Sequence, residues 1–520
     1  MKYRKSILWS IVFLFILVGC VMSRTTSYAK TKQYITVDMQ AKSTPRKSLQ
    51  AVFDEIGENN KTNSNILYVV TIPRGTYEIN GVLRVFSNTY VKMKGVTLKR
   101  TSAKSMLHLG EDADAFNGYN GYHDITFEGG TWDGNGKEHS KYDVSIVRLG
   151  HGKKITFKGV TFTNVVEAHH LEMAACRDVV FDKCTFSNFV GKSDGNVEAL
   201  QIDIMRKSHF PKYDKYDDTP CKNITIKNCK FYNLQRGMGT HSGVAGSYHE
   251  NITISNNVFE NIQGYAIRGT NYRKAKIKNN KINNVGAGIM LCNMSTSREN
   301  FYKPLSGKPK IKNNSYSSIT GNTITVTDKK YDAAGYGIAV YGDILLKKTN
   351  GIPKGNYSIK QVKVSDNVIT MKNKEYGIWL YRANNSTISN NKITMSIPGN
   401  ASGIYYGNAV HMVAGSGITI KNNSMTFTSK NKKSKYSCGI VILSYSNATI
   451  TDNVINNSCR DGIRVAYGSY ATIRNNTLKK PGRYAVYVYK KSQAHCKGNK
   501  FYKVSKKKRM KKDKGSKIKK

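Results

Sequence analysis

The sequence predicts an all-β fold, a right-handed parallel β-helix whose short strands wind into stacked coils, preceded by a short N-terminal helix. A strand-and-corner motif that recurs along the chain predicts the coils, and so does a second strand that repeats at a closest spacing of 23 residues. An amphipathic stretch near the start predicts the helix. We divide the chain into an export signal, a cap with the first coils, the β-helix and a tail: residues 1–29, 30–120, 121–503 and 504–520.

The recurring motif is a short alternating strand, then an Asn-containing corner, then a further apolar pair. It appears as NITIKNCKF, NITISNNVF, KAKIKNNKI, STISNNKIT, ITIKNNSMT, ATITDNVIN and ATIRNNTLK. Strands this short cannot bury a face alone, but coils stacked on one another can. The Asn at each corner tolerates a left-handed backbone, and we expect it to form a ladder with the Asn of the next coil.

A second strand follows in each coil, and its closest repeats, GIVI, GIRV and AVYV, are 23 residues apart. That period corresponds to one coil with three short strands. Strand–corner–strand units without helices between them exclude a doubly wound α/β fold. A Greek-key sandwich would explain the strands but not the fixed period.

The N-terminus carries an export signal. Basic residues within the first five positions precede the apolar run ILWSIVFLFILVGCVM, the order typical of a secretory signal. Cleavage after Ala29 and lipidation of Cys20, with a lipoprotein signal up to residue 19, both stay open, as does a retained membrane anchor. In each case the sequence predicts that the rest of the chain is exported, either secreted or held at the cell surface.

The composition is strongly basic, with 82 Lys and Arg against 34 Asp and Glu and a net charge of +48. A hydrophobic content of 39% and only 9 Pro indicate a folded protein rather than a disordered polycation. Residues 504–520 predict a basic disordered tail, whose partner in an exported protein would be an anionic cell wall or polysaccharide and not nucleic acid. We expect a monomer, since a trimeric tail-spike-like hydrolase would call for coiled-coil heptads, which the sequence lacks.

Two segments with identical cysteine spacing, CRDVVFDKC and CKNITIKNC, stand in consecutive repeats. No CxxC motif or His-rich partner supports a metal site. We interpret these cysteines as small apolar residues stacked from coil to coil, with a disulfide between coils left open after export.

The start of the exported chain resembles a known family. TPRKSLQAVFDEIGENN predicts a helix with Pro45 at its start and with Leu49, Val52, Phe53 and Ile56 on one face. VVTIPRGTYEING, VTLKR and ITFEGGTWDGNGK follow. This series is similar to the opening region of the pectate-lyase/polygalacturonase superfamily of right-handed β-helices, and the likeness covers most of the exported chain. It implies that the helix caps the open end of the core.

Polar side chains gather on the second strands of four consecutive coils. If the Ile or Leu after each Gly or Ala points into the core, its neighbours point out. The outward positions are then His170, Glu172, Gln201, Asp203, Gly239, His241, Arg268 and Thr270. Parallel rungs lie about 4.8 Å apart, so we expect Asp203 beside His241, and Glu172 and Arg268 each about 8 Å away on a diagonal. This face is predicted to be a solvent groove.

We expect Asp203, His241, Arg268 and Glu172 to be catalytic. A carboxylate beside an imidazole suits proton transfer, because it raises the pKa of the His and holds its tautomer. Arg268 would bind a uronic-acid carboxylate, and Glu172 would supply the second carboxylate that glycoside hydrolysis needs. Further side chains along the groove are predicted to bind substrate: His170, Glu198, Gln201, Arg236, Tyr341, Trp379 and Tyr381.

The resemblance also bears on activity, since the superfamily includes hydrolases, lyases, epimerases and binding proteins. Asp203 in LQID, His241 in GTHSG and Arg268 in AIRGTN match an Asp, a His and a basic residue that polygalacturonases use. RGMG stands where those enzymes have an Asp pair, so the set is more similar to uronate epimerases or lyases of this fold. The resemblance implies no required cofactor. Calcium, common in related lyases, stays open, although the sequence offers no clear ligand set for it.

The sequence therefore predicts an exported enzyme that cleaves or modifies an acidic, uronic-acid-containing polysaccharide by acid/base chemistry in the groove. The alternative is a non-catalytic surface protein, a polysaccharide-binding or adhesin β-helix held to the wall by its basic end. The loss of His241 distinguishes the two functions, because it would impair an enzyme but would leave glycan binding by a surface protein unchanged.

Overall fold

The computed structural model describes residues 30–112, 114–191, 197–211, 213, 215–294, 300–327, 335–349, 351–372, 375–397, 407–428 and 437–520. The export signal predicted for residues 1–29 lies outside these ranges. Within them, no helix is both long and apolar enough to cross a bilayer.

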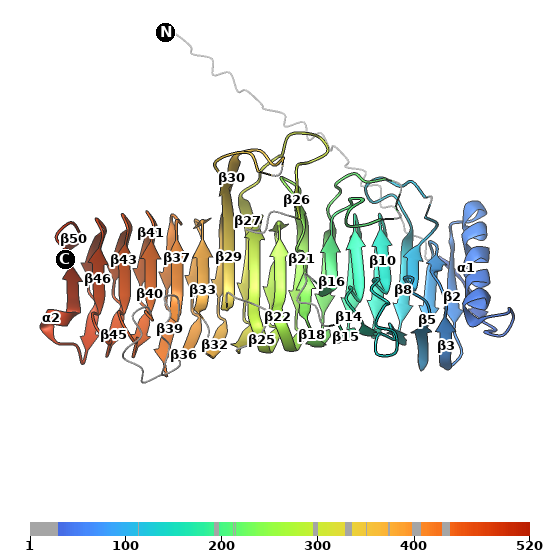
Figure 1. Ribbon diagram of the computed structural model, residues 1–520, viewed down its shortest axis with the longest axis horizontal. Helices are drawn as coiled ribbons and strands as arrows, with labels where there is room; N and C mark the ends of the chain where they lie inside the picture. The colour runs from blue at the N-terminus through green and yellow to red at the C-terminus, as the bar shows by residue number, and fades with distance from the viewer. Residues whose placement is uncertain are drawn as a thin grey trace, which may run out of the picture.

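The described chain winds into an elongated stack of coils with almost every strand pairing in parallel (Figure 1). A first row of strands forms one sheet, consisting of β1 (Thr31–Thr36), β2 (Ile66–Thr71), β5 (Thr89–Lys92), β8 (His123–Glu128), β11 (Lys153–Lys158), β14 (Arg177–Asp182), β17 (Lys222–Lys227), β21 (His249–Ser255), β23 (Tyr272–Arg273), β24 (Lys276–Lys278), β27 (Asn314–Thr320), β31 (Ile359–Ser365), β34 (Ala383–Asn384), β35 (Thr387–Ser389), β38 (Ile418–Lys421), β41 (Asn447–Thr451), β44 (Tyr470–Arg474), β47 (Gln493–Lys497) and β50 (Lys517–Lys519).

The other two strands of each coil belong to a second, larger sheet. Its second row consists of β3 (Gly75–Ile79), β6 (Val96–Arg100), β9 (Thr131–Asp133), β12 (Thr161–Val165), β15 (Thr185–Phe189), β18 (Lys230–Leu234), β28 (Thr323–Val326), β32 (Val368–Lys372), β36 (Lys392–Ser396), β39 (Ser424–Phe427), β42 (Val454–Asn456), β45 (Thr477–Lys479) and β48 (Lys500–Tyr502). Its third row consists of β4 (Leu83–Val85), β7 (Leu107–Leu109), β10 (Val147–Gly150), β13 (Leu171–Ala174), β16 (Glu198–Asp203), β19 (Arg236–Gly239), β29 (Tyr336–Leu345), β33 (Tyr376–Tyr381), β37 (Asn408–Val413), β40 (Ile440–Leu443), β43 (Ile463–Ala466), β46 (Val486–Tyr489) and β49 (Met510–Lys512).

Two long strands, β22 (Val258–Thr270) and β25 (Lys281–Asn293), run through both rows and join them. Outside the rows, β30 (Gly355–Tyr357) pairs antiparallel with β29, and β20 (Gly243–Val244) pairs with β26 (Phe301–Tyr302). The expected three strands per coil are therefore present. The expected period is present too, because Ile440, Ile463 and Val486 are successive register partners 23 residues apart.

Apolar side chains from the three rows fill the inside of the coils. Rings stack from one coil to the next, as Phe157 does on Phe181 with centroids 5.2 Å apart and Phe231 does on Phe259 at 4.6 Å. The cysteines of the two matching segments lie buried in consecutive coils as free thiols, in agreement with their interpretation as core residues.

A ladder of buried asparagines joins the coils at the corner between the first and second rows. From Asn280 onward, each ladder Asn accepts two hydrogen bonds on its Oδ1, from the backbone N–H and the Nδ2 of the Asn one coil earlier, at 2.9 to 3.1 Å. The Oδ1 of the first member, Asn257, accepts a hydrogen bond from Cys229 N at 2.8 Å. The members of the ladder are Asn257, Asn280, Asn322, Asn367, Asn391, Asn423, Asn453, Asn476 and Asn499. The expected ladder is confirmed. The left-handed backbone falls on the residue before it, as at Asn422 with φ 55°.

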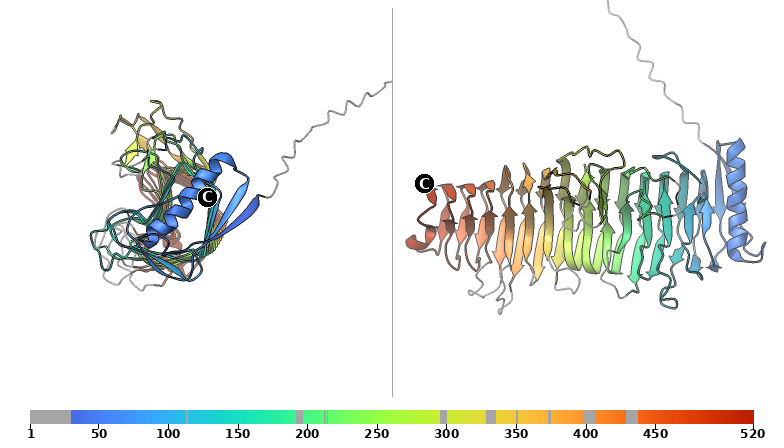
Figure 2. Two further views of the ribbon diagram at one scale, coloured as in Figure 1. Left: turned by 90° about the vertical axis from the view of Figure 1, so that its right-hand side faces the viewer. Right: turned by 45° about the horizontal axis from the view of Figure 1, so that its top comes forward.

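The predicted helix is α1 (Pro45–Thr62), which lies across the N-terminal end of the stack (Figure 1). Thr44 caps it by accepting a hydrogen bond from Lys47 N, and Leu49, Phe53 and Ile56 are buried against the first coils. The end view in Figure 2 shows the helix over the opening of the solenoid. A helix is well placed here because it covers the apolar interior that no further coil protects.

The C-terminal end differs from the disordered tail expected for residues 504–520. These residues form α2 (Lys506–Arg509) and then β49 and β50, which pair with β46 and β47. Met510 and Ile518 pack on the core, and Ser516 Oγ accepts a hydrogen bond from Ser492 N. The basic composition of residues 504–520 suggested disorder, but three apolar or small residues are enough for them to form one more coil of the stack.

The asparagine ladder makes the first prediction. Asn423→Ala should lower the free energy of unfolding by roughly 2–4 kcal/mol, because it leaves several buried donors and acceptors of neighbouring coils without partners. The matched control is Asn422→Gly, at an exposed left-handed position that glycine accepts, with an expected change within about 0.5 kcal/mol. Urea unfolding of the two variants measures the difference; equal losses would contradict a specific role for the ladder.

Candidate functional site

The polar positions of the third row share one register across five coils. Arg148, Glu172, Gln201, Gly239 and Arg268 are successive Cα partners on β10, β13, β16, β19 and β22. This is the register that the sequence predicts for Glu172, Gln201, Gly239 and Arg268. It follows from the buried partners on either side, such as Leu200 and Met238.

The N-terminal part of this row is covered and is not the open groove that we expected. Glu172 is 6% exposed and Asp203 1%. The long loop after β16 lies over them: Phe210 and Tyr213 are buried on Ala174, and the guanidinium of Arg148 lies 4.3 Å from the centre of the Phe210 ring. Arg148 Nε also donates to Glu172 Oε2 at 3.0 Å. Polar side chains can stand on this face because the loop supplies partners for them.

The chemical centre of the face is a pair formed by His241 and Glu198. His241 Nδ1 lies 2.8 Å from Glu198 Oε2, and the hydroxyl of Tyr265 donates to Glu198 Oε1. With its amide oriented to satisfy both ends, Gln201 Nε2 donates to Glu198 Oε2 at 3.2 Å. Glu198 is fully buried, whereas the side chain of His241 keeps 10% of its surface exposed. Solvent therefore reaches the imidazole but not the carboxylate that holds it.

Asp203 forms a second acidic point beside this pair. Its Oδ1 accepts hydrogen bonds from the Ser242 hydroxyl and from Ile204 N, and its Oδ2 lies 3.9 Å from His209 Nδ1. The orienting partner of His241 is therefore Glu198 and not Asp203 as expected, although the charge of Asp203 still raises the pKa of His241. The reason is local: β19 ends at Gly239, so His241 lies beyond the strand, where alternation no longer applies, and its Nδ1 turns to Glu198.

Two further imidazoles complete the cluster, and both were missed by the sequence prediction. The ring of His169 stacks on that of His241 with centroids 6.0 Å apart, and the ring of His209 lies 6.3 Å from it. His209 comes from the long loop and contacts the Tyr302 hydroxyl at 2.8 Å through Nε2. No spacing in the sequence signals these residues.

His170 was expected on this face and is instead buried in the wall of the solenoid. Its Nε2 lies 2.7 Å from Ser187 O, and it is fully buried. The strand β13 begins only at Leu171, so the alternation that holds from Leu171 onward does not extend back to the turn that carries His170. Its neighbour His169 occupies the expected place.

Charge decides which of the three imidazoles is protonated. Burial alone would lower the pKa of His241, but Glu198 and Asp203 outweigh it and raise that pKa above its ordinary value. Burial lowers the pKa of His169 and of His209. Glu198, despite its burial, has a pKa held below its usual range by His241 and Arg236. The pair is therefore an ionised carboxylate and an imidazole that binds its proton firmly.

The carboxyl groups of Glu172 and Asp203, which the loop covers, have pKa shifts of opposite sign. Burial raises the pKa of Glu172 to about 8, against the effect of Arg148 and with a further rise from Asp203. Asp203 has a lowered pKa because His209, His241 and Ser242 outweigh the effect of its burial. Two neighbouring carboxyl groups with opposite shifts have the properties of an acid and a base.

Arginines and aromatic rings continue the face toward the C-terminal coils. The guanidinium carbons of Arg236 and Arg268 lie 4.9 and 5.8 Å from the centre of the Tyr265 ring. Trp379 is half-buried, 5.6 Å from Tyr341, whose ring stacks on Tyr381 at 4.7 Å. The predicted Tyr341, Trp379 and Tyr381 are thus one aromatic group, three to four coils beyond His241. Together these residues form a strip parallel to the long axis.

Within the described part of the chain, no three or more His, Cys, Asp or Glu side chains are grouped so that they could hold a metal ion. No chemical step is assigned to a metal.

Comparisons with known proteins agree with the architecture. The family described as "Right handed beta helix region" matches residues 126–282, 217–424 and 354–510. The Plasmin and fibronectin-binding protein A of Streptococcus pneumoniae is 25% identical over 355 residues, which is 59% of this chain and 49% of that protein. The chain thus spans about half the length of this relative.

Two solved structures are also similar. The crystal structure of PfbA, a surface adhesin of Streptococcus pneumoniae, has 17% identity and a TM-score of 0.47 over 94% of this chain and 93% of that one. The tailspike protein of Escherichia coli bacteriophage HK620, in complex with a pentasaccharide, has 13% identity and a TM-score of 0.43 over 88% and 74%. Since the family match extends over most of the chain, the protein belongs to the right-handed β-helix family.

Proposed function

We propose that the protein acts on an acidic, uronic-acid-containing polysaccharide by acid/base chemistry at the Glu198–His241 pair. The observation that carries this proposal is the geometry of that pair: a buried carboxylate fixes Nδ1 of a partly exposed imidazole, which directs the other ring nitrogen away from Glu198. A fixed tautomer and a raised pKa are what general acid–base catalysis asks of a histidine.

The neighbouring groups support an acidic sugar as the substrate. Arg236 and Arg268 flank Tyr265 next to the pair, and guanidinium groups bind carboxylates with two parallel hydrogen bonds. The aromatic group around Trp379 lies along the same row, where flat apolar rings suit the faces of sugars. A glycan lying along the row would meet cationic, proton-transferring and aromatic side chains in turn.

The roles follow from position. His241, with a raised pKa, exchanges the proton with substrate, and Glu198 orients it and stabilises its charged form. Asp203, covered by the loop, adds its negative charge to the cluster, and Glu172, whose pKa burial raises, accepts a hydrogen bond from Arg148. This differs from the expectation that Asp203 orients His241. The net charge of +48 draws a polyanion toward the face.

A second candidate, binding without catalysis, is favoured by the sequence match to a protein named for binding plasmin and fibronectin. In either case we propose an exported protein at the cell surface, with residues 1–29 as its export signal. The basic last coil, in which α2 carries Lys506, Lys507, Lys508 and Arg509, would face the anionic cell wall.

The enzymatic proposal predicts turnover that depends on His241. The chain from residue 30 onward, incubated with a panel of acidic and neutral polysaccharides, should change an acidic one, and His241→Ala should reduce the rate by about 10²-fold or more. New reducing ends with ultraviolet absorbance of unsaturated uronides indicate a lyase, reducing ends alone a hydrolase, and an altered uronate stereochemistry by NMR an epimerase. The matched control is His495→Ala, on the outer face of β47 in the first row. Equal rates in both variants would contradict the proposal.

The Glu198–His241 pair also predicts how stability depends on pH. A raised folded-state pKa means that His241 stabilises the fold fully below about pH 6.5, the unfolded value, and that this contribution is lost as pH rises through the folded pKa. The difference in unfolding free energy between the wild type and His241→Gln should therefore shrink as the pH is raised from about 6 to about 9. Urea unfolding at several pH values measures it; a difference that grows with pH would have the wrong sign.

The binding candidate makes a separable prediction. If the protein is an adhesin, immobilised plasmin or fibronectin should retain it by surface plasmon resonance, and His241→Ala should bind as well as the wild type. Binding carried by surface charge should also weaken between about 0.05 and about 0.5 M salt. Retention of neither protein at low salt, together with His241-dependent turnover, would exclude this candidate.

A further inference from the structure

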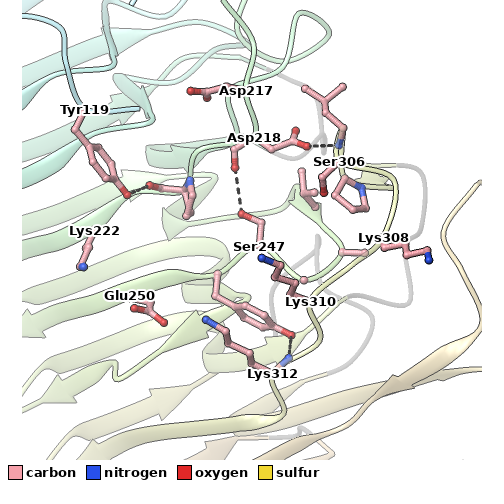
Figure 3. Close-up of a pocket in the computed structure, with 17 residues that line it drawn as sticks. Tyr119, Asp217, Asp218, Lys222, Ser247, Glu250, Ser306, Lys308, Lys310 and Lys312 are labelled. Atoms are coloured by element: carbon pink, nitrogen blue, oxygen red, sulfur yellow. Dashed lines mark hydrogen bonds between the residues drawn. The ribbon is translucent and has the colours of Figure 1, made fainter. Parts of the chain in front are cut away.

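A cavity of about 500 Å³ lies beside the first row, at the start of β17 and β21. Its walls come from the loop before β17, the segment that follows β20, and residues 304–312. Figure 3 shows its side chains, with Asp217 and Asp218 along one edge and Lys222, Glu250, Lys310 and Lys312 along another. None of the residues that line it belongs to the His241 cluster. A volume of this order is in the range of small-molecule sites.

The segment of residues 304–312, which carries three of the cavity's lysines, is held by a hydrogen bond near each end. Leu305 N donates to Asp218 Oδ2 at 2.7 Å, and Lys312 N donates to the Tyr248 hydroxyl at 2.9 Å. Between them the backbone of Lys310 packs against Gly246, where an added Cβ would lie 2.5 Å from Lys310 N and φ is +79°. Only glycine allows this approach, so the segment is held close to the loop that faces it.

The carboxylates of the cavity are already engaged by the protein. Asp218 accepts from Arg206 Nη2 at 2.8 Å as well as from Leu305 N. Asp217 accepts from Gly118 N at 2.7 Å and from Thr219 N at 3.0 Å. Glu250 pairs with Arg273. Arg206 and Arg273 offset the charges of Asp218 and Glu250, whereas Asp217 keeps its negative charge while it holds the loop through two backbone N–H groups.

The lysines of the cavity are in the opposite situation. Lys222, Lys308, Lys310 and Lys312 line it, and the last three are exposed. In the described ranges no ion pair joins any of the four to an acidic side chain. Lys308, Lys310 and Lys312 stand at alternate positions of one segment. A lysine ammonium is a point charge with rotatable donors, which suits anionic groups carried on a flexible chain.

We propose that this cavity is a second binding site, separate from the His241 site, that holds an acidic oligosaccharide through Lys222, Lys310 and Lys312. The half-buried ring of Tyr119 and the exposed side chain of Leu305 provide surface for sugar rings, and the lysines pair with carboxylate or sulfate groups. The site requires no chemistry at His241. It would anchor a long glycan whether the protein turns it over or only binds it.

Binding is tested with fluorescent octasaccharides on the chain from residue 30 onward at about 0.15 M salt. An oligogalacturonate carries carboxylates, a heparin-derived octasaccharide carries sulfates as well, and malto-octaose is neutral. The triple variant Lys222→Gln/Lys310→Gln/Lys312→Gln should weaken at least one charged probe by about tenfold or more. The matched control removes the same charge from exposed first-row lysines, as Lys276→Gln/Lys278→Gln/Lys363→Gln, and should change affinity less than about threefold.

Location is tested in the same samples by lysine acetylation and mass spectrometry. A bound charged probe should protect Lys222, Lys310 and Lys312 and leave the control lysines reactive. Whether the oligogalacturonate or the heparin-derived octasaccharide protects the cavity lysines shows whether the site binds carboxylate or sulfate groups. Malto-octaose should protect neither the cavity lysines nor the control lysines. Equal losses in the two triple variants, or no protection of the cavity lysines by either charged probe, would overturn the proposal. In His241→Ala the same charged probe should still protect Lys222, Lys310 and Lys312, so failure here is distinguishable from failure of the enzymatic proposal.

Discussion

The constraint on which the rest of the structure depends is the fixed register between coils, held by the buried asparagine ladder. Each ladder side chain bonds to the next and also donates Nδ2 to a carbonyl of the preceding coil, as Asn391 does to Val364 O at 3.0 Å. A slip of one residue would break these bonds and turn the apolar positions outward. Because the ladder sits at one corner, the other two corners are free to carry loops of different length.

That freedom explains how a repetitive wall carries a chemically distinct site. The third row keeps its register through Arg148, Glu172, Gln201 and Arg268, while the long loop after β16 lays Phe210 and His209 over it. The loop excludes solvent from the carboxyl groups of this row. Charges interact more strongly in such an environment, so these groups shift one another's pKa values. The imidazole of His241 stays at the edge of the cover, where solvent and a substrate both reach it.

Strand positions could be predicted from the sequence, and turn positions could not. Period-two alternation placed Glu172, Gln201 and Arg268 correctly, because buried Ile and Leu neighbours hold each strand in place. It failed at His170, before its strand begins, and at His241, after its strand ends, since backbone direction there depends on turn geometry. Glu198 was expected only to bind substrate; its place under His241 depends on which way that turn bends.

The central claim is that Glu198 holds His241 as a proton carrier, and the most direct measurement is an NMR titration of ¹³C-labelled histidine side chains. The account predicts that the His241 imidazole titrates above about 6.5 in the wild type and below that wild-type value in Glu198→Gln. His209, whose pKa burial lowers, should titrate below the ordinary value in both. A His241 pKa at or below the ordinary value in the wild type, or one that Glu198→Gln leaves in place, would contradict the account.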